Sequence, residues 1–242
     1  MKERLQKVLS KSGHGSRRAC EELIIQGRVK INDKTAEIGE KADPIVDLIT
    51  LDGEKISSIP SKKIYIALHK PRGVLSEVNS QDNRLGLKSL LNINEQLICV
   101  GRLDKNSEGL ILLTNDGDLT YQLTHPSFTH EKEYRVLVSR YPDEKKLDSW
   151  RKGGIVLEDG YLTSPAKVYI ERQEDKNVWL RVIMHEGRKR QIRQVGAQLG
   201  LPVQRIIRIR IGNLELNDLK PGEWRYLSNK EIVRLMELVE PH

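Results

Sequence analysis

Two strongly apolar runs on either side of a short polar loop constrain the fold of this chain most. The runs are Leu97–Val100 and Leu110–Leu113, and the second ends at an Asn-Asp-Gly sequence. Short apolar runs bounded by turn-forming residues are typical of buried strands. The loop between them contains Asp104, and a carboxylate held between two buried strands can act as a nucleophile or a general base. The alternative is an aspartate that only caps the loop.

The composition indicates a soluble protein with room for one large domain, or for a small and a medium one. Of the 242 residues, 31% are charged and 38% are hydrophobic, and no apolar run approaches the roughly 20 residues that span a bilayer. The N-terminus enters a charged amphipathic pattern without a signal-peptide core, so we expect a cytoplasmic protein. Cys20 and Cys99 lie far apart in apolar surroundings, which favours buried free thiols over a disulfide or a metal site.

The charge pattern favours a polyanionic partner. The net charge is +7 and the pI is near 9.3. Residues 1–34 hold nine Lys and Arg against four Asp and Glu, and residues 181–210 hold eight against one. Two separate basic regions predict a long RNA that is contacted at two places. The alternative is a pair of solvated basic faces without a partner.

The N-terminal segment is expected to form a compact module of two helices and a small sheet. Apolar residues at helical spacing predict a helix over residues 3–12. Ser16 is the expected N-cap of a second helix, which Gly27 ends. The expected buried side of that helix consists of Ala19, Cys20, Leu23 and Ile24. Strands are expected at Val29–Ile31 and Leu48–Leu51, each before a turn sequence.

A linker-like composition at residues 57–63 predicts a domain boundary, with one domain over residues 1–60 and another over residues 61–242. We expect the second to be an α+β domain on a mostly antiparallel sheet, because hairpins alternate with a few helices along it. Asp118 is the expected cap of a short helix. The expected strands of this domain lie at 64–69, 132–138, 154–158, 166–171 and 178–184.

Residues 101–117 resemble the central motif of one class of ribosomal RNA pseudouridine synthases, which comprises type A for the small ribosomal subunit and types B, E and F for the large one. The family pattern is G-R-L-D, two variable residues, Thr or Ser, one variable residue, then G-L-L-L-L-T-N-D-G. This chain follows it, with Ser107 at the Thr position and Ile111 within the leucine run. The resemblance implies that Asp104 is the catalytic aspartate.

Two further segments resemble motifs of the same family. Residues 132–134, at the start of an alternating strand, are similar to its K-x-Y motif, which implies that Tyr134 stacks on the target base. Residues 187–193, at the start of a helix, resemble its G-R/K-x-x-Q-I/L/V-R/K motif. This likeness implies that Arg193 forms an ion pair with the catalytic aspartate and keeps it charged. It also implies that Ile192 lines the floor of the base pocket.

The resemblance also implies which cations of this region contact RNA. In related synthases the arginine of the G-R-L-D motif helps to hold the RNA after the target nucleotide leaves the stack, and Arg102 occupies that position here. Arg188, Lys189 and Arg190 are expected to contact phosphates, although a run of three cations is by itself usually solvated surface.

The N-terminal module resembles an S4-type RNA-binding domain. The segments that match are Arg4-Leu5, Gly13, Ser16-Arg17-Arg18, Leu23-Ile24, Gly27-Arg28-Val29 and Ile31-Asn32. In that fold the second helix presents basic side chains to structured RNA, and free N–H groups at a helix N-terminus also attract phosphate. The likeness therefore implies RNA contacts for Arg17, Arg18 and Arg28.

These resemblances cover nearly the whole chain and imply an enzyme that isomerises a uridine of ribosomal RNA to pseudouridine, without cofactor or metal. Residues 5–18 and 205–224 are similar to type B of the class, which favours 23S over 16S ribosomal RNA. The expected partner is ribosomal RNA or a pre-ribosomal particle, with no membrane and no nucleotide, and the chain is expected to be a monomer. One alternative is a non-catalytic RNA-binding assembly factor. The other, an S4-linked methyltransferase, would need a glycine-rich donor-binding loop that we do not find.

Overall fold

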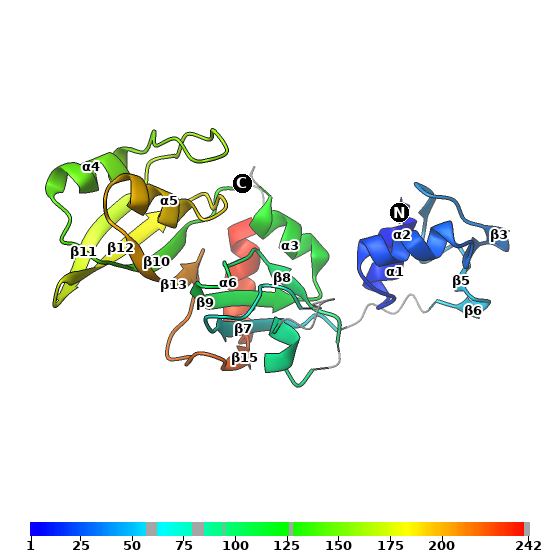
Figure 1. Ribbon diagram of the computed structural model, residues 1–242. Coiled ribbons are helices and arrows are strands. Elements are labelled where there is room, and N and C mark those ends of the chain that lie inside the picture. The colour runs from blue at the N-terminus through cyan, green and yellow to red at the C-terminus, as the bar shows by residue number, and fades with distance from the viewer. Residues whose placement is uncertain (57–61, 79–84, 94, 126–127, 240–242) are drawn as a thin grey trace. The chain divides into compact units, whose positions relative to one another are not determined.

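The computed structural model describes residues 1–56, 62–78, 85–93, 95–125 and 128–239. The chain forms two compact units. The smaller unit consists of Met1–Ile64 with Asn94–Leu97, and the larger of Tyr65–Ile93 with Ile98–His242 (Figure 1). Most of the expected linker falls outside the described residues, so the boundary at residue 60 stays a prediction.

Two helices and two small antiparallel sheets make up the described part of the smaller unit. The helices are α1 (Leu5–Lys11) and α2 (Arg17–Ile25). One sheet has the order β3 (Lys34–Thr35), β2 (Val29–Ile31), β5 (Ile49–Leu51), β6 (Glu54–Lys55), and the other pairs β1 (Glu3–Arg4) with β4 (Lys41–Ala42). The buried core is formed by Leu5, Val8, Leu9, Cys20, Ile24, Val29, Ala36, Ala42, Ile49 and Ile56.

The predicted second helix of this unit is confirmed, but one of its expected core residues is wrong. The Ser16 hydroxyl accepts a hydrogen bond from the Ala19 N–H at 3.2 Å and caps the helix. Gly27, with φ +70°, follows the last turn, as a helix end requires. Ala19 is exposed, because the helix buries only the narrow stripe of Cys20 and Ile24, one turn apart.

A sheet with nine strands among the described residues forms the larger unit. Its main path is β11-β12-β10-β13-β9-β7-β15, with β14 beside β13 and β8 beside β9. The strands are β7 (Tyr65–Lys70), β8 (Ile98–Val100), β9 (Glu108–Thr114), β10 (Lys132–Val138), β11 (Lys167–Glu174), β12 (Asn177–Met184), β13 (Val203–Ile211), β14 (Leu214–Glu215) and β15 (Trp224–Tyr226). All described pairs are antiparallel except β9 with β13. The predicted α+β class is confirmed.

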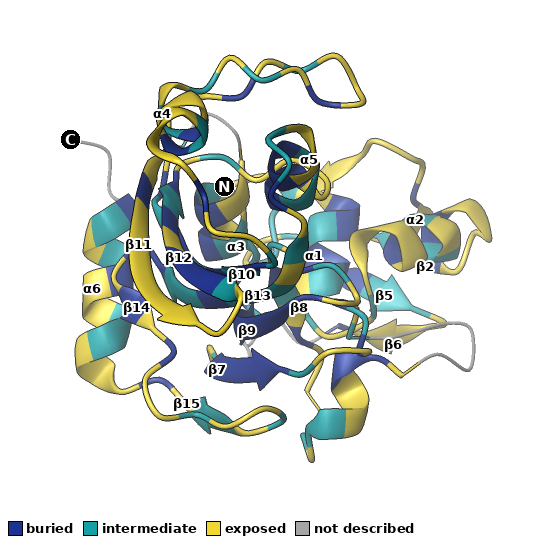
Figure 2. Cartoon of the chain, turned by 60° about the vertical axis from the view of Figure 1, so that its left-hand side comes forward, coloured by how far each residue is buried: buried dark blue, intermediate teal, exposed yellow. Residues whose placement is uncertain are grey.

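Helices cover the sheet at both ends of this unit (Figure 1). α3 (Gly117–Thr124) and α6 (Asn229–Val239) pack on the side of β7 and β9 that bears Ala67, Leu110 and Leu112. α4 (Glu144–Lys152) packs against β11, and α5 (Gln191–Gln198) against β13. A short 3₁₀ helix, η1, spans Leu87–Leu90. β7 and β9 are buried along their whole length (Figure 2), so this part of the sheet is a rigid base for the loops at its ends.

Asp116 caps α3, and the expected cap at Asp118 is wrong. The Asp116 Oδ1 accepts hydrogen bonds from the N–H groups of Asp118 and Leu119, both at 3.2 Å. An N-cap must stand in extended backbone directly before the first turn, which is where the Asn-Asp-Gly sequence puts Asp116. Asp116 Oδ2 also accepts a hydrogen bond from the Tyr65 hydroxyl at 2.9 Å, which joins α3 to β7.

One expected strand is absent, and another forms but is less buried than expected. No strand forms at 154–158, where only an isolated bridge joins Val156 to Leu162. The apolar run at 97–100 does form β8, but Ile98 is 41% exposed, because β8 lies beside β9 alone. Cys99, expected to be buried, is half-buried for the same reason.

The parallel contact between β9 and β13 depends on a glycine. Gly109 pairs with Arg208 and has φ +111°. A Cβ atom at this position would lie 2.2 Å from the Arg208 carbonyl oxygen. Only glycine therefore allows the two backbones to approach as they do.

We predict that Gly109→Ala destabilises the protein by more than about 2 kcal/mol, since strain and a backbone clash combine. The measurement is equilibrium unfolding in urea. Gly222→Ala is the matched control, because Gly222 has φ +90° but open space around its Cα. It should cost about 1 kcal/mol, the strain alone. Equal losses of unfolding free energy in the two variants would contradict the close approach of β9 and β13 at Gly109.

A capping box begins α6. The Ser228 N–H donates to Glu231 Oε2 at 2.9 Å, and the Glu231 N–H donates back to the Ser228 hydroxyl at 3.4 Å. Arg225 also donates to Glu231, with Nη1 at 2.9 Å from Oε2. Hydrogen bonds from Arg225, with those from Ser228, lower the pKa of Glu231 to about 2.

Because the folded-state pKa of Glu231 is depressed, its stabilising contribution is present above about pH 4.5 and is lost as the pH falls toward 2. We predict that Glu231→Gln lowers the free energy of unfolding by about 1 kcal/mol at pH 7. The difference from the wild type should shrink below pH 4.5. Denaturant titrations across this range measure it. Glu237→Gln, an exposed change on the same helix, should be neutral throughout.

Candidate active site

Asp104 lies in the loop that joins β8 to β9. Gly101, with φ +72°, turns the chain out of β8, and the Ser107 N–H bonds to the Asp104 carbonyl at 2.9 Å to close a turn before β9. Leu103 is buried, with 8% of its surface exposed, and anchors the loop. Asp104 is half-buried, and within the described ranges its carboxylate has no hydrogen bond or ion pair. The loop therefore presents a carboxylate that is held in place but not neutralised.

The Asp104 carboxylate lines a cleft of about 410 Å³. Segments from four parts of the larger unit meet there, namely the loop after β7, the Asp104 loop, the strands β10, β12 and β13, and the start of α5. The lining residues are Leu75, Ser76, Glu77, Arg102, Leu103, Asp104, Lys105, Ser107, Tyr134, Met184, Gly187, Arg188, Lys189, Arg190, Gln191, Ile192 and Ile206. The sequence motifs around Asp104, Tyr134 and Ile192 thus meet in one place.

One wall of the cleft is apolar. Tyr134 and Ile192 are each 7% exposed, and Met184 and Ile206 lie beside them in the lining. Tyr134 comes from β10, which pairs with β12 and β13 over its whole length, so its ring has little freedom. A flat aromatic side chain in the same cleft as a carboxylate suits a planar heterocycle.

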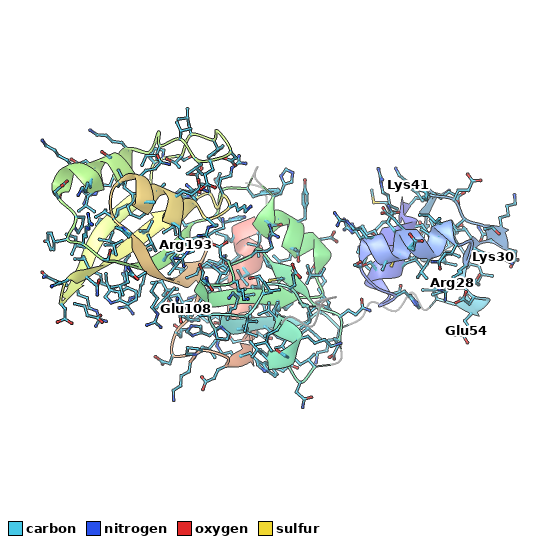
Figure 3. The ribbon with its side chains drawn as sticks, in the orientation of Figure 1. Arg28, Lys30, Lys41, Glu54, Glu108 and Arg193 are labelled. Carbon is cyan, nitrogen blue, oxygen red and sulfur yellow. The ribbon has the colours of Figure 1, made fainter. Side chains whose placement is uncertain are left out.

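Arg193 lies near Asp104, but the expected ion pair is not formed. No contact of 4.0 Å or less joins their charged groups in the described part of the chain. Arg193, labelled in Figure 3, instead donates to two carbonyl oxygens, those of Val203 and Asn106, each at 3.1 Å. Burial lowers the pKa of Arg193, the nearby Arg190 lowers it further, and Asp104 opposes both effects.

Five cations line the cleft, and no ion pair joins any of them to a carboxylate in the described residues. They are Arg102, Lys105, Arg188, Lys189 and Arg190, all exposed. Several arginines elsewhere in this unit are paired with carboxylates, such as Arg210 with Glu133 at 2.8 Å. Unpaired cations around a single cleft create a field that attracts a polyanion.

Two of these cations have special local geometry. The guanidinium of Arg188 stacks over the Tyr161 ring at 3.8 Å from its centre. Arg190 is the N-cap of α5 and has φ +53°, a left-handed conformation that is strained for arginine. Arg188 and Arg190 therefore have defined positions, which free solvated side chains would lack.

Lys70, for which the sequence predicted no role, lies under the Asp104 loop. Lys70 is fully buried, and its Nζ donates to the carbonyl oxygens of Pro71 at 2.9 Å and Lys105 at 3.3 Å. Burial lowers its pKa to about 8, although Glu108 and Asp104 act in the opposite direction. Lys70 is the last residue of β7 and begins the sequence Lys70-Pro71-Arg72-Gly73.

The expected RNA-binding residues of the smaller unit differ in their pairing. Arg17 and Arg18 are exposed at the start of α2. Arg28, labelled in Figure 3, donates from Nε to Asp52 at 2.9 Å, and this bond raises its pKa. Arg28 is thus already paired, whereas Arg17 and Arg18 make no ion pair within the described ranges.

No metal centre or membrane span is found in the described ranges. They contain no group of three or more His, Cys, Asp or Glu side chains placed to hold a metal ion. None of their helices combines the length and apolar character that a membrane crossing requires.

Known proteins resemble this chain over almost its full length. The model of the RNA pseudouridylate synthase family matches residues 64–198, and that of the S4 domain matches residues 3–44. An uncharacterized RNA pseudouridine synthase of Aquifex aeolicus is 40% identical, over 99% of this chain and 96% of the relative. Ribosomal large subunit pseudouridine synthase B of Yersinia pestis is 37% identical, over 99% of this chain and 77% of the relative.

A solved structure agrees with the sequence relatives. A crystal structure of a pseudouridylate synthase superimposes with a TM-score of 0.69 and 29% identity, over 96% of this chain and 99% of the other. The residues matched by the family model contain Asp104, Tyr134 and Ile192. The chain therefore belongs to the RNA pseudouridylate synthase family and has an S4 domain at its N-terminus.

Proposed function

We propose that this protein converts a specific uridine of large-subunit ribosomal RNA to pseudouridine in the Asp104 cleft. The observation that supports this most is a half-buried, unpaired carboxylate that lines the same cleft as Tyr134 and five unpaired cations. In this proposal Asp104 takes part in the chemical step, and the target base stacks on Tyr134. The cations hold the RNA backbone.

In the proposed reaction the uridine leaves its stack, because a paired uracil hides both C5 and the glycosidic bond. The base stacks on Tyr134, and Arg102 helps to hold the RNA around the vacated position. The N1–C1′ bond breaks, the uracil turns, and a C5–C1′ bond forms. C5 loses a proton and N1 gains one, so the reaction is redox-neutral and needs no group donor.

Three roles are open to Asp104 in this scheme: attack on the sugar, attack on the base, or removal of a sugar proton. Arg193 acts on the loop rather than through a direct ion pair, since its guanidinium bonds to the Asn106 carbonyl. Ile192 packs under the base. Arg188, Lys189 and Arg190 contact phosphates, and Arg17 and Arg18 of the S4 domain add a second region of contact.

The choice of large-subunit RNA rests on relatives named ribosomal large subunit pseudouridine synthase B, which are 37% to 38% identical to this chain. We propose that the protein acts as a monomer. The proposed substrate is ribosomal RNA, free or in a pre-ribosomal particle. We therefore propose that the protein acts in the cytoplasm. A 16S target and a non-catalytic assembly role are the competing outcomes of the experiments below.

We predict that Asp104→Asn lowers the rate of pseudouridine formation at least about 10³-fold, because an amide can neither attack nor accept a proton. Release of tritium from [5-³H]uridine-labelled 23S and 16S transcripts measures the rate. Asp218→Asn, the same change at an exposed position, should react like the wild type. Release by Asp104→Asn equal to that by wild type would refute the aspartate mechanism, and no release by wild type would favour the assembly role.

Chemical mapping of pseudouridines in a deletion strain identifies the target. We expect one 23S position to lose its pseudouridine and to regain it with wild type but not with Asp104→Asn. A loss confined to 16S RNA would overturn the choice of the large ribosomal RNA while leaving the reaction intact.

The unpaired cations of the cleft give a separate prediction. Lys189→Gln should raise KM for the transcript and reduce the slope of log affinity against log salt by about one, with little change in kcat. Lys176→Gln removes the same charge from an exposed position outside the cleft lining and is the control. Equal effects of the two changes would mean that general charge, not the cleft, attracts the RNA.

A further inference from the structure

The Asp104 loop is held by its backbone. Three cations from separate parts of the chain donate to its carbonyl oxygens. Lys70 Nζ lies 3.3 Å from the Lys105 oxygen, Arg193 Nη2 lies 3.1 Å from that of Asn106, and Arg208 Nη1 lies 3.5 Å from that of Arg102. These contacts hold the backbone on both sides of Asp104. None of them involves the peptide between Leu103 and Asp104, which bonds to a different side chain.

That group is Ser76. Its hydroxyl accepts a hydrogen bond from the Leu103 N–H at 2.9 Å and donates one to the Leu103 carbonyl oxygen at 2.6 Å. Ser76 is 7% exposed and Leu103 is 8% exposed, so little water competes for these bonds. A single hydroxyl thus satisfies both polar backbone groups of one buried residue.

The position of these bonds matters because the Leu103 carbonyl belongs to the peptide that precedes Asp104. Holding both polar groups of Leu103 restricts rotation of this peptide, and therefore the direction in which the Asp104 side chain leaves the backbone. The hydroxyl of Ser76 uses its donor and one acceptor site in the two bonds. It is thus engaged with the loop although the residue is part of the cleft lining.

We propose that Ser76 is a positioning residue that aims the Asp104 carboxylate at the substrate. This inference rests on the proposed catalytic role of Asp104. It assigns a function to a serine 28 positions earlier in the chain, in the loop after β7, outside the motifs around Asp104, Tyr134 and Arg193. A small displacement of a reacting group lowers the rate steeply while substrate affinity hardly changes.

The first test is kinetic. Ser76→Ala should lower kcat by about 10- to 100-fold on the transcript and change KM less than about threefold. Ser76→Thr retains the hydroxyl and should recover most of the rate. Ser89→Ala is the matched control, since Ser89 also donates to a backbone carbonyl, that of Gly86 at 2.7 Å, but lies outside the cleft lining. A wild-type kcat for Ser76→Ala would overturn the proposal, as would a rise in KM alone, which would indicate direct contact with the RNA.

The second test does not depend on activity. Amide hydrogen exchange at Leu103 should accelerate about tenfold or more in Ser76→Ala, because its N–H loses its acceptor, and should stay unchanged in Ser89→Ala. Ser76→Cys, close in volume with a weaker hydrogen-bonding group, replaces Ser76→Ala if that variant fails to fold. Unchanged exchange in the altered protein would overturn the proposal. If the wild type forms no pseudouridine, the proposed function fails. Hydrogen exchange at Leu103 still tests whether Ser76 restrains the Asp104 loop.

Discussion

The close approach of β9 and β13 at Gly109 is the constraint on which the larger unit depends. It is the one parallel contact in the described sheet, and it joins the strands β10 to β12 to the buried pair β7 and β9. Gly109 also stands five residues after Asp104, so the same contact sets the end of the Asp104 loop. Gly109 thus allows β9 and β13 to pack closely and also lies just after the Asp104 loop.

Charge in the larger unit is divided between paired and unpaired groups. Arg205 and Glu108 bond to each other, and Arg210 bonds to Glu133, so these charges cancel locally. The cations of the cleft lining lack such partners within the described ranges, and so does Asp104. An unpaired charge is costly unless a ligand or water meets it, so this division separates the groups that stabilise the fold from those available to a substrate.

Local sequence chemistry predicted much of the fold. Ser16, the apolar run 110–113 and the alternation at 132–138 each specify one element with little dependence on the rest of the chain, and the structure has all three. The errors fall where context decides. Ile98 is apolar but exposed, because edge position depends on which strands lie next to β8. Asp116 and Asp118 differ as caps only through backbone geometry at a single turn.

The sequence by itself determined the family motifs, the fold class and the residues Asp104, Tyr134 and Ile192 that meet in the cleft, because each is marked by a local pattern. Only the tertiary structure decided how Asp104 is held. Arg193 bonds to the Asn106 carbonyl and not to the carboxylate, and Ser76 bonds to both polar groups of Leu103. Such bonds to the backbone leave no residue pattern, since every residue has the same carbonyl group, and they join segments far apart in the chain.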